Sequence, residues 1–376
     1  MQQPGADTSI LRVGVLADTI DRPGGIARYT EELVAALARR DDVRLVVAAP
    51  AAASGRVEAL AGARLDAMVT IPTVGQLRMA LWERYTSGAK FEKAGVQLVH
   101  GTKHLVPRTS LPTVLTVHDL MTITRARESA LAKRMFLPRQ YRTSMRSATR
   151  LLSVSRATRD RIVAIDGRWG AKTVVVPNGL SHALLDVTPR PVPGLAAARF
   201  ALVVGDLAPR KNVEMLLDLW PDVASEATDF PLVVLGHPGP HSADTTRRLA
   251  ELEHRNLAIW LRGASDGELR WCYEHATVVL LPTLEEGFGF PLLEALTFGA
   301  PSIASTDAAL VEVSAASPEV EHLDIRDREA WRRAVVRAAG RPPREPPAHP
   351  VTPPGAVSWD ENAGEVMDLY RSLVRP

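Results

Sequence analysis

The chain has 376 residues, more than one hydrophobic core usually organises, so two domains are expected. Hydrophobic residues make up 46% of the chain and the formal net charge is only +2. These values exclude intrinsic disorder and give no electrostatic reason to expect nucleic-acid binding. The single cysteine, Cys272, excludes an intramolecular disulfide, and its place in a helical pattern indicates core packing.

The first ten residues, MQQPGADTSI, are polar and lack the basic start and apolar stretch of a signal peptide. The apolar runs that follow are of strand length and fall far short of a membrane span. We therefore expect a cytoplasmic protein and leave open a peripheral place at the inner face of the membrane.

Short runs that are apolar throughout alternate with helical patterns along the chain. Strands that are buried on both faces, as in parallel sheets covered by helices, have this composition. Two series of such runs predict two doubly wound, Rossmann-like α/β domains. The predicted strands are residues 12–17, 43–49, 96–101, 113–118, 151–155 and 173–177, then 200–206, 231–236, 257–263, 277–282 and 301–305.

The segment TPRPVPG at 188–194 marks the expected boundary between the domains, because its prolines cannot lie inside a central strand or helix. The N-terminal domain is predicted to span 1–190 and the C-terminal domain 195–340. Ligands of open parallel sheets bind at the carboxyl ends of the strands. Two such domains that face each other would leave a central cleft, and functional residues should lie directly after strands.

A second proline-rich segment, RPPREPPAHPVTPPG, predicts a semi-rigid spacer over 341–357. After it, Ser358 and Glu361 have the spacing of a capping box. Apolar residues then recur at helical spacing. The pattern predicts a terminal helix within 358–376 that packs on the body of the protein.

The most informative segment, EGFGFPLLE, follows the strand predicted at 277–282 and places Glu286 eight residues before Glu294. Its glycines permit a tight turn and a close approach of the backbone to a ligand, and its proline suits the first position of a helix. Free N–H groups at that helix start favour a phosphate. A plain turn with solvated glutamates would explain an isolated Gly-x-Gly but not this whole unit. The candidate ligand-binding residues beside Glu286 are Gly287, Phe288, Gly289, Phe290 and Glu294.

A second motif, GDLAPRKN at 205–212, follows the strand predicted at 200–206. Departure of a nucleoside diphosphate leaves negative charge on an oxygen, and Arg210 and Lys211 could stabilise it as fixed cations. The alternative is an ordinary exposed basic pair, and we expect Lys211 to be exposed in either case. No Asp-x-Asp and no cysteine–histidine cluster occurs, so no metal site is predicted and the cations are expected to replace a metal.

The first predicted domain offers weaker signals. Gly24 and Gly25 follow the first strand and either approach a ligand or form a flexible loop. They do not complete a Gly-x-Gly-x-x-Gly, which argues against a dinucleotide dehydrogenase. His118 is the last residue of the strand predicted at 113–118 and either binds a ligand or bonds a backbone carbonyl. Asp119 either orients His118 or caps the next helix.

These segments resemble the retaining family 4 glycosyltransferases, whose Glu-x7-Glu signature matches Glu286 and Glu294. The resemblance covers most of the chain and is strongest over 200–313. It implies the GT-B fold, with the acceptor in the first domain and the nucleotide sugar in the second. It also implies that Arg210 and Lys211 hold the diphosphate and that Glu294 holds the ribose. Glu286, the backbone of 287–290 and His118 would lie beside the sugar.

The chain departs from the family pattern in two places. PNGL at 177–180 matches a family stretch, but Ser181 stands where an aspartate is common, so Asn178 and Gly179 are interpreted as structural. The segment LVEVSAASPEVEHLD lacks the usual Gly-Asp-Ala. Glu312 in that segment is a weaker candidate for the nucleotide pocket.

We therefore predict a metal-independent hexosyltransferase that acts on a glycan, lipid-linked or small-molecule acceptor, with no cofactor beyond the sugar nucleotide. The similarity of TVHDL, PRKN and EGFGFPLLEA to bacterial polysaccharide mannosyltransferases favours GDP-mannose as the donor. Two alternatives remain, a sugar-nucleotide epimerase of similar fold and a catalytically degenerate partner subunit. The acceptor, the linkage and the oligomeric state do not follow from the sequence.

An arginine-rich stretch bears on partners other than the donor. Its arginines recur at three- and four-residue spacing in one helical pattern, with Lys133 and Arg134 just before. A solvated helix face and an attraction to anionic headgroups or an acceptor phosphate are both consistent with it. The residues concerned are Arg139, Arg142, Arg146 and Arg150.

Overall fold

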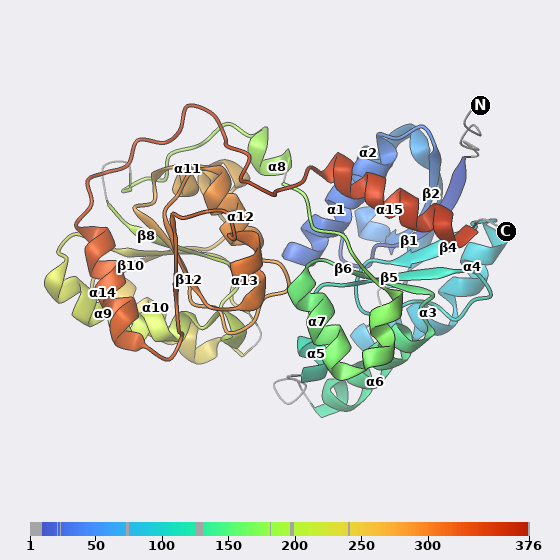
Figure 1. Ribbon diagram of the computed structural model, residues 1–376, viewed down its shortest axis with the longest axis horizontal. Helices are drawn as coiled ribbons and strands as arrows, with labels where there is room; N and C mark the ends of the chain where they lie inside the picture. The colour runs from blue at the N-terminus through green and yellow to red at the C-terminus, as the bar shows by residue number, and fades with distance from the viewer. Residues whose placement is uncertain are drawn as a thin grey trace. The chain divides into compact units, whose positions relative to one another are not determined.

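The computed structural model describes residues 10–20, 22, 24–72, 75–124, 131–180, 182–195, 199–239 and 241–374. It divides into two compact units (Figure 1). Unit 1 consists of Met1–Gly179 with Val357–Pro376, and unit 2 of Leu180–Ala356. The division precedes the boundary expected at 188–194, because the short helix α8 (His182–Leu185) already packs on α11 (Asp266–His275) of unit 2.

Unit 1 is built on a seven-stranded parallel sheet with the order β3-β2-β1-β4-β5-β6-β7. The six strands predicted in the first half of the chain are present, and β3 was missed. That edge strand is mostly half-buried and mixes polar with apolar residues, so it lacks the continuous apolar run of a central strand. The strands are β1 (Leu11–Leu16), β2 (Val43–Pro50), β3 (Leu65–Ile71), β4 (Leu98–Gly101), β5 (Thr113–Val117), β6 (Arg150–Ser153) and β7 (Thr173–Val175).

Helices cover this sheet, and two of them, from opposite ends of the chain, lie side by side (Figure 1). These are α1 (Gly25–Ala38) and α15 (Trp359–Val374), which pack against each other. The predicted capping box is confirmed: the Ser358 and Glu361 side chains each accept a hydrogen bond from the other residue's backbone N–H. The other helices of unit 1 are α2 (Ser54–Ala61), α3 (Gln76–Tyr85), α4 (Ser87–Lys93), α5 (Met121–Thr124), α6 (Leu131–Ser147) and α7 (Arg156–Ile165).

The arginine-rich stretch does not form one continuous helix. Helix α6 carries Arg139, Arg142 and Arg146, all exposed, and ends at Ser147. Arg150 instead begins β6, so its inclusion in the helical stripe was wrong. The side chains of Lys133 and Arg134 lie outside the described part of the structure. No described helix has both the length and the apolar character needed to cross a membrane.

Unit 2 contains a six-stranded parallel sheet with the order β10-β9-β8-β11-β12-β13. The five strands predicted in the second half of the chain are present, and the missed strand, β13, again lies at an edge and is only half-buried. The strands are β8 (Ala201–Val204), β9 (Leu232–Leu235), β10 (Ala258–Leu261), β11 (Val278–Leu281), β12 (Ser302–Ser305) and β13 (Val320–Leu323). The remaining helices are α9 (Val213–Glu226), α10 (Ala243–His254), α12 (Phe290–Thr297), α13 (Ala308–Val313) and α14 (Arg328–Ala339).

The proline-rich segment at 341–356 belongs to unit 2 and is tied to it by hydrogen bonds. The Arg344 guanidinium donates to the carbonyl oxygens of Phe298 at 2.9 Å and Tyr273 at 3.0 Å, at the ends of α12 and α11. The Val351 N–H donates to the Thr297 carbonyl at 2.7 Å. The segment thus connects α14 of unit 2 to the start of α15 in unit 1, as the predicted linker would, and side chains and backbone groups between its prolines also find partners on unit 2.

In each sheet the order of the strands reverses at one internal point. The chain leaves the two neighbouring strands at that point toward opposite edges of the sheet. In unit 1 this switch point lies between β1 and β4, and in unit 2 between β8 and β11. Open parallel sheets bind ligands outside the carboxyl ends of the strands at such a point. The loops after these four strands are therefore where functional side chains are expected.

Candidate functional site

The loops after β8 and β11 are joined at the switch point of unit 2. The Arg210 carbonyl accepts hydrogen bonds from the Leu284 N–H at 2.8 Å and from Thr283 Oγ1 at 3.0 Å. The Asn212 side-chain amide donates to the Pro282 carbonyl at 3.2 Å. These bonds fix the one-turn helix η5 (Pro209–Lys211) against the loop that leads to Glu286.

Glycines permit this close packing. Gly205 ends β8 with a φ of 135°, and a Cβ there would lie 3.3 Å from Cε of Lys211. A Cβ on Gly236, after β9, would lie 1.8 Å from the Gly205 carbonyl oxygen, a distance no side chain can occupy. The backbone at Gly205 can therefore lie close both to Gly236 and to the Lys211 side chain.

Arg210, Lys211 and Glu286 meet in this loop. Oε1 of Glu286 pairs with the Lys211 ammonium and lies 3.7 Å from Nη1 of Arg210. Arg210 also contacts Oδ1 of Asp206 at 3.1 Å. Lys211 was expected to be exposed, but its side chain is only 13% exposed, because the pairing with Glu286 draws it inward.

The environment keeps Glu286 ionised. Burial raises the pKa of its carboxyl, but the charges of Lys211 and Arg210 and the hydrogen bonds from Lys211 and Thr283 outweigh burial and lower the pKa overall. Thr283 Oγ1 lies 3.5 Å from Oε1 of Glu286. The site thus holds two cations around one buried carboxylate. An anionic ligand could bind here by taking the place of the carboxylate as the partner of the cations.

Helix α12 begins beside this cluster in the sequence. Gly289 precedes it with a φ of 103°, and a Cβ at that position would lie 2.6 Å from Cδ2 of Leu310. Pro291 occupies the first turn, where its missing N–H costs nothing. Gly287, Phe288 and Phe290 complete the turn, and the rings of Phe288 and Phe290 pack edge to face with centroids 5.3 Å apart.

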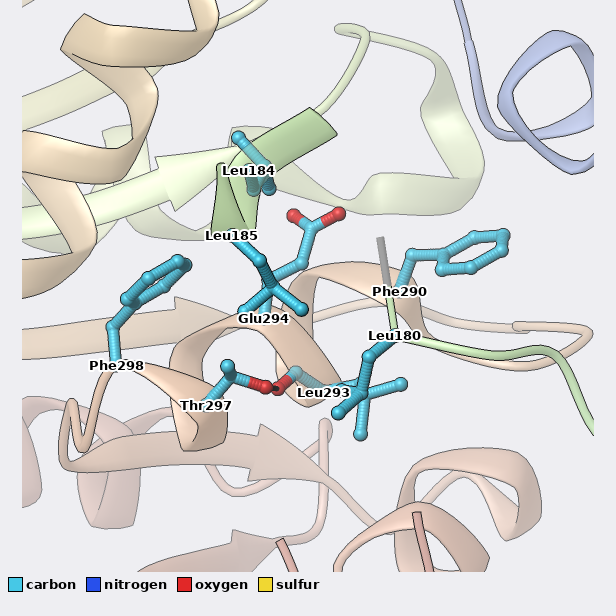
Figure 2. Close-up of a pocket in the computed structure, with 8 residues that line it drawn as sticks. All are labelled: Leu180, Leu184, Leu185, Phe290, Leu293, Glu294, Thr297 and Phe298. Atoms are coloured by element: carbon cyan, nitrogen blue, oxygen red, sulfur yellow. Dashed lines mark hydrogen bonds between the residues drawn. The ribbon is translucent and has the colours of Figure 1, made fainter. Parts of the chain in front are cut away.

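Glu294 lies one turn along α12 in a different setting. Its Oε2 accepts a hydrogen bond from the Tyr273 hydroxyl at 2.8 Å, and the residue is 5% exposed. Figure 2 shows its side chain among Leu184, Leu185 and Phe290, in a small and mainly apolar pocket. The enclosed free volume of about 10 Å³ has room for a single water molecule. Contact between Glu294 and ribose stays a prediction.

The candidates in unit 1 occupy separate positions at the carboxyl edge of its sheet. Gly24 has a φ of 120° and precedes α1, which begins at Gly25. His118 Nε2 lies 2.8 Å from the Thr102 carbonyl oxygen, and Asp119 Oδ1 accepts the Met121 N–H at 3.0 Å, at the start of α5. His118 thus bonds a backbone carbonyl and Asp119 caps the next helix, which are two of the alternatives that the sequence left open.

Burial lowers the pKa of His118 to about 4, opposed by the Thr102 hydrogen bond and aided by the charge of Lys103. The ring is therefore neutral at physiological pH. With Nε2–H donating to Thr102, Nδ1 carries a lone pair that can accept a hydrogen bond from a ligand hydroxyl.

Several other predictions can be placed. Asn178 is buried, and a Cβ on Gly179 would lie 2.5 Å from the Trp359 nitrogen, which agrees with a structural role. Glu312 is half-buried on α13, and Ser181 lies outside the described residues. Burial, and then the charge of Glu268, raise the pKa of Cys272 to about 12, as suits a core thiol.

Three side chains that contact the predicted residues were missed. Thr283 lies two residues after the end of β11, so the rule that ligands bind at the carboxyl ends of strands could have found it. Asp206 lies within the quoted GDLAPRKN motif. Tyr273 gave no signal, because a tyrosine in an amphipathic helix usually packs in the core. Within the described ranges, no group of three or more His, Cys, Asp and Glu side chains is arranged to hold a metal.

Comparison with known families identifies the chain. The family model described as Glycosyltransferase Family 4 matches residues 23–184, and the model described as Glycosyl transferases group 1 matches residues 194–333. The chain belongs to the family 4 glycosyltransferases. The two matches fall on opposite sides of the segment around residue 190.

Curated relatives of this family 4 chain are distant. The O-antigen chain mannosyltransferase B of Escherichia coli is 28% identical over 224 residues, which are 57% of this chain and 58% of that protein. The chain thus spans little more than half of that relative. The O-antigen chain mannosyltransferase RfbU of Salmonella typhimurium is 22% identical over 72% of this chain and 75% of that protein.

The solved structure of HepE from Anabaena in complex with UDP and glucose is similar to the family 4 chain with a TM-score of 0.67. It is 15% identical and covers 96% of this chain and 100% of that chain. At this identity the similarity shows the fold alone. Together with the two parallel-sheet units, it confirms the predicted GT-B fold.

Proposed function

We propose that the chain transfers a hexose from a nucleoside-diphosphate sugar to an acceptor hydroxyl, with retention of the anomeric configuration. The observation that carries this proposal is the pair of cations, Arg210 and Lys211, gathered on Glu286 at the switch point of unit 2. A diphosphate that enters this position would replace the carboxylate as the partner of both cations. Membership of the family supports the same assignment.

The reaction requires stabilisation of a leaving diphosphate. The bond between the sugar's anomeric carbon and the phosphate oxygen breaks, and the acceptor oxygen forms its bond on the same face. The departing phosphate oxygen takes the proton of the acceptor hydroxyl. Fixed cations in a largely buried site lower the barrier to this step because they need little reorganisation, which is why we propose that no metal takes part.

Other residues have supporting roles in the proposal. Glu286, once released from Lys211, and the backbone of 287–290 would contact the transferred sugar. Glu294 would hold the ribose, with Tyr273 fixing its carboxylate. His118 would offer Nδ1 to a sugar hydroxyl.

The donor that we propose to test first is GDP-mannose, since two similar proteins are named O-antigen chain mannosyltransferases. The HepE structure contains UDP and glucose, so UDP-glucose is the matched comparison. For the acceptor we propose a glycan or a lipid-linked sugar.

The test begins with thermal shifts of the purified chain in GDP, UDP and their hexose conjugates. It continues with transfer of labelled hexose to a panel of sugars. A stabilising nucleotide sugar whose hexose is transferred supports the proposal. Conversion of the free donor to its epimer, or absence of any nucleotide-dependent stabilisation, would refute it in favour of an epimerase or a non-catalytic subunit.

A further inference from the structure

A chain of four hydrogen-bonded side chains runs through the core of unit 1, near the carboxyl ends of β4 and β5. In its middle, Nδ1 of His100 lies 2.5 Å from the Tyr370 hydroxyl and Nε2 of His100 lies 2.7 Å from Oγ1 of Thr116. Oγ1 of Thr116 lies 2.9 Å from the Tyr29 hydroxyl. All four residues are fully buried. The chain therefore joins α15 to α1, which lie side by side, through two strands of the sheet (Figure 1).

The imidazole of His100 allows little freedom within this chain. Burial, and then the charge of His118, lower the pKa of His100 to about 3, so the ring is neutral and has one N–H. A neutral imidazole donates at one nitrogen and accepts at the other. A flip of the ring would therefore break its hydrogen bonds to Tyr370 and Thr116 together.

Such a chain contributes more to a unique packing than to stability. Apolar side chains of the same shape can replace buried hydrogen-bonded groups at little cost, whereas a polar network in which every member is paired makes a core rigid. The group that it holds here is the ring of Tyr29. Trp359, the first residue of α15, also packs against that ring, with centroids 5.6 Å apart.

Tyr29 is the member of the chain that reaches the candidate site. Its ring packs edge to face on the ring of His118, with centroids 4.6 Å apart and planes at 83°. His118 is half-buried, and its Nε2 bonds the Thr102 carbonyl. A single hydrogen bond leaves an imidazole room to turn, and the neighbouring ring of Tyr29 restrains that turn. Helix α1 also holds the partner residue, since Oγ1 of Thr30 lies 3.1 Å from Oγ1 of Thr102.

We infer that Tyr29 is a positioning residue for His118, whose imidazole it keeps in the orientation that leaves Nδ1 for a ligand. Thr116, His100 and Tyr370 act behind Tyr29, and through them α15 takes part in the geometry of the site. That His118 contacts the transferred sugar rests on the proposed function. That Tyr29 fixes the ring of His118 rests on unit 1 alone.

The first test is nitrogen-15 NMR of the histidine rings in the full chain without ligand, because ring-nitrogen shifts report which nitrogen is protonated. His118 of the wild type, assigned with His118→Gln, should be a single Nε2–H tautomer. Tyr29→Leu removes the restraining ring and should bring in the second tautomer. Tyr29→Phe keeps the ring but loses the bond to Thr116, so it should bring in less of that tautomer. Tyr85→Phe is the matched control and should match the wild type, since Tyr85 lies on α3 of the same unit and is 48% exposed.

The second test separates kcat from nucleotide binding, with GDP-mannose as the donor. Tyr29→Leu should lower kcat at least about tenfold, since displacing a group by about 1 Å can cost about 100-fold in rate. Tyr29→Phe and Tyr370→Phe should each lower kcat about two- to tenfold, the scale of one neutral hydrogen bond. Because both hydroxyls belong to one chain, the double variant should be about as slow as the slower single variant. GDP affinity should stay at the wild-type value, because the predicted partners of GDP lie in unit 2.

Unchanged His118 shifts in both Tyr29 variants would overturn the inference. So would a fall in GDP affinity that parallels the fall in kcat, because it would mark a general loss of structure. Multiplication of the two single effects in the double variant would overturn the part assigned to Tyr370. Should Tyr29→Leu not fold, Tyr29→Phe decides alone. A wild type without transfer activity would refute the proposed function, and the NMR test would still decide the role of Tyr29.

Discussion

The buried pair of Lys211 and Glu286 should be energetically coupled, and a double-mutant cycle can measure the coupling. In Lys211→Met the Glu286 carboxylate, 11% exposed, keeps Arg210 as a neighbouring cation, 3.7 Å away. Breaking a buried pair by removal of one partner costs about 3–5 kcal/mol. Because Arg210 remains and neither partner is fully buried, we expect about 2 kcal/mol for Lys211→Met.

Glu286→Gln should cost less, about 1 kcal/mol, because the flexible lysine can move into water once the carboxylate is gone. For a unit of this size 1 kcal/mol shifts the melting temperature by about 2–4 °C. Lys211→Met should therefore lower the transition of unit 2 by about 4–8 °C. The double variant should be less destabilised than the sum of the single variants, by about 1–2 kcal/mol.

The assay is differential scanning calorimetry of the nucleotide-free protein at neutral pH and low salt. Arg247→Met is a suitable control, since Arg247 forms ion pairs on α10 of the same unit but its side chain is 60% exposed. Such a surface pair contributes at most about 1 kcal/mol. Strict additivity of Lys211→Met and Glu286→Gln would show that solvent screens the pair and that other contacts hold the two loops together.

Three further predictions concern the remaining groups. If Glu294 holds ribose, Glu294→Gln should raise the donor KM about 10- to 150-fold with little change in kcat. Glu286→Gln should mainly lower kcat. Steady-state kinetics measure both constants, and the reverse pattern would exchange the two roles. Transfer should persist in excess EDTA, and loss of activity that Mn²⁺ restores would show that a metal replaces the arginine–lysine pair. Burial, chiefly, lowers the pKa of His100 and His104 to about 3 and of His118 to about 4. Unfolding exposes these histidines to protons, so unit 1 should lose about 1.4 kcal/mol per pH unit for each of them as the pH falls below about 6.5, and urea titrations with no such loss would contradict the burial.

Sequence patterns located the interior strands of both sheets and one edge strand of each, β7 and β10, but missed the opposite edge strands, β3 and β13. Central strands such as β8 and β11 are apolar throughout because helices cover both faces, and that pattern is visible in one sequence. The edge strands β3 and β13 are half-exposed, so they mix polar and apolar residues like many helices and loops. The proline-rich segment is another case: its composition indicates an extended connection, but the contacts by which Arg344 and Val351 attach it to unit 2 are tertiary and leave no local pattern.

The candidate site was predictable as a set of residues but not as a set of contacts. Strand ends and the spacing of the motifs selected Arg210, Lys211 and Glu286. Their mutual pairing depends on how the loops after the neighbouring strands β8 and β11 pack together, as in the hydrogen bond from the Leu284 N–H to the Arg210 carbonyl, and no local pattern shows such a contact. The contact of Tyr273 with Glu294 joins two helices and is likewise tertiary.

The two switch points show how one architecture can favour different ligands. Each places a lysine against a carboxylate, Lys211 with Glu286 in unit 2 and Lys103 with Asp18 in unit 1. Such a pair keeps both charges satisfied before a ligand arrives, so binding exchanges one partner for another and avoids leaving a bare charge in a buried site. The neighbours then set the preference. Around Glu286 a second cation approaches, and the carboxylate that balances it, Asp206, is 36% exposed. In unit 1 the charge of Asp18 instead acts on another buried carboxyl, Glu83, whose pKa it helps to raise. Buried charges are screened less than exposed ones, so the switch point of unit 2 attracts an anion more strongly than the switch point of unit 1 does.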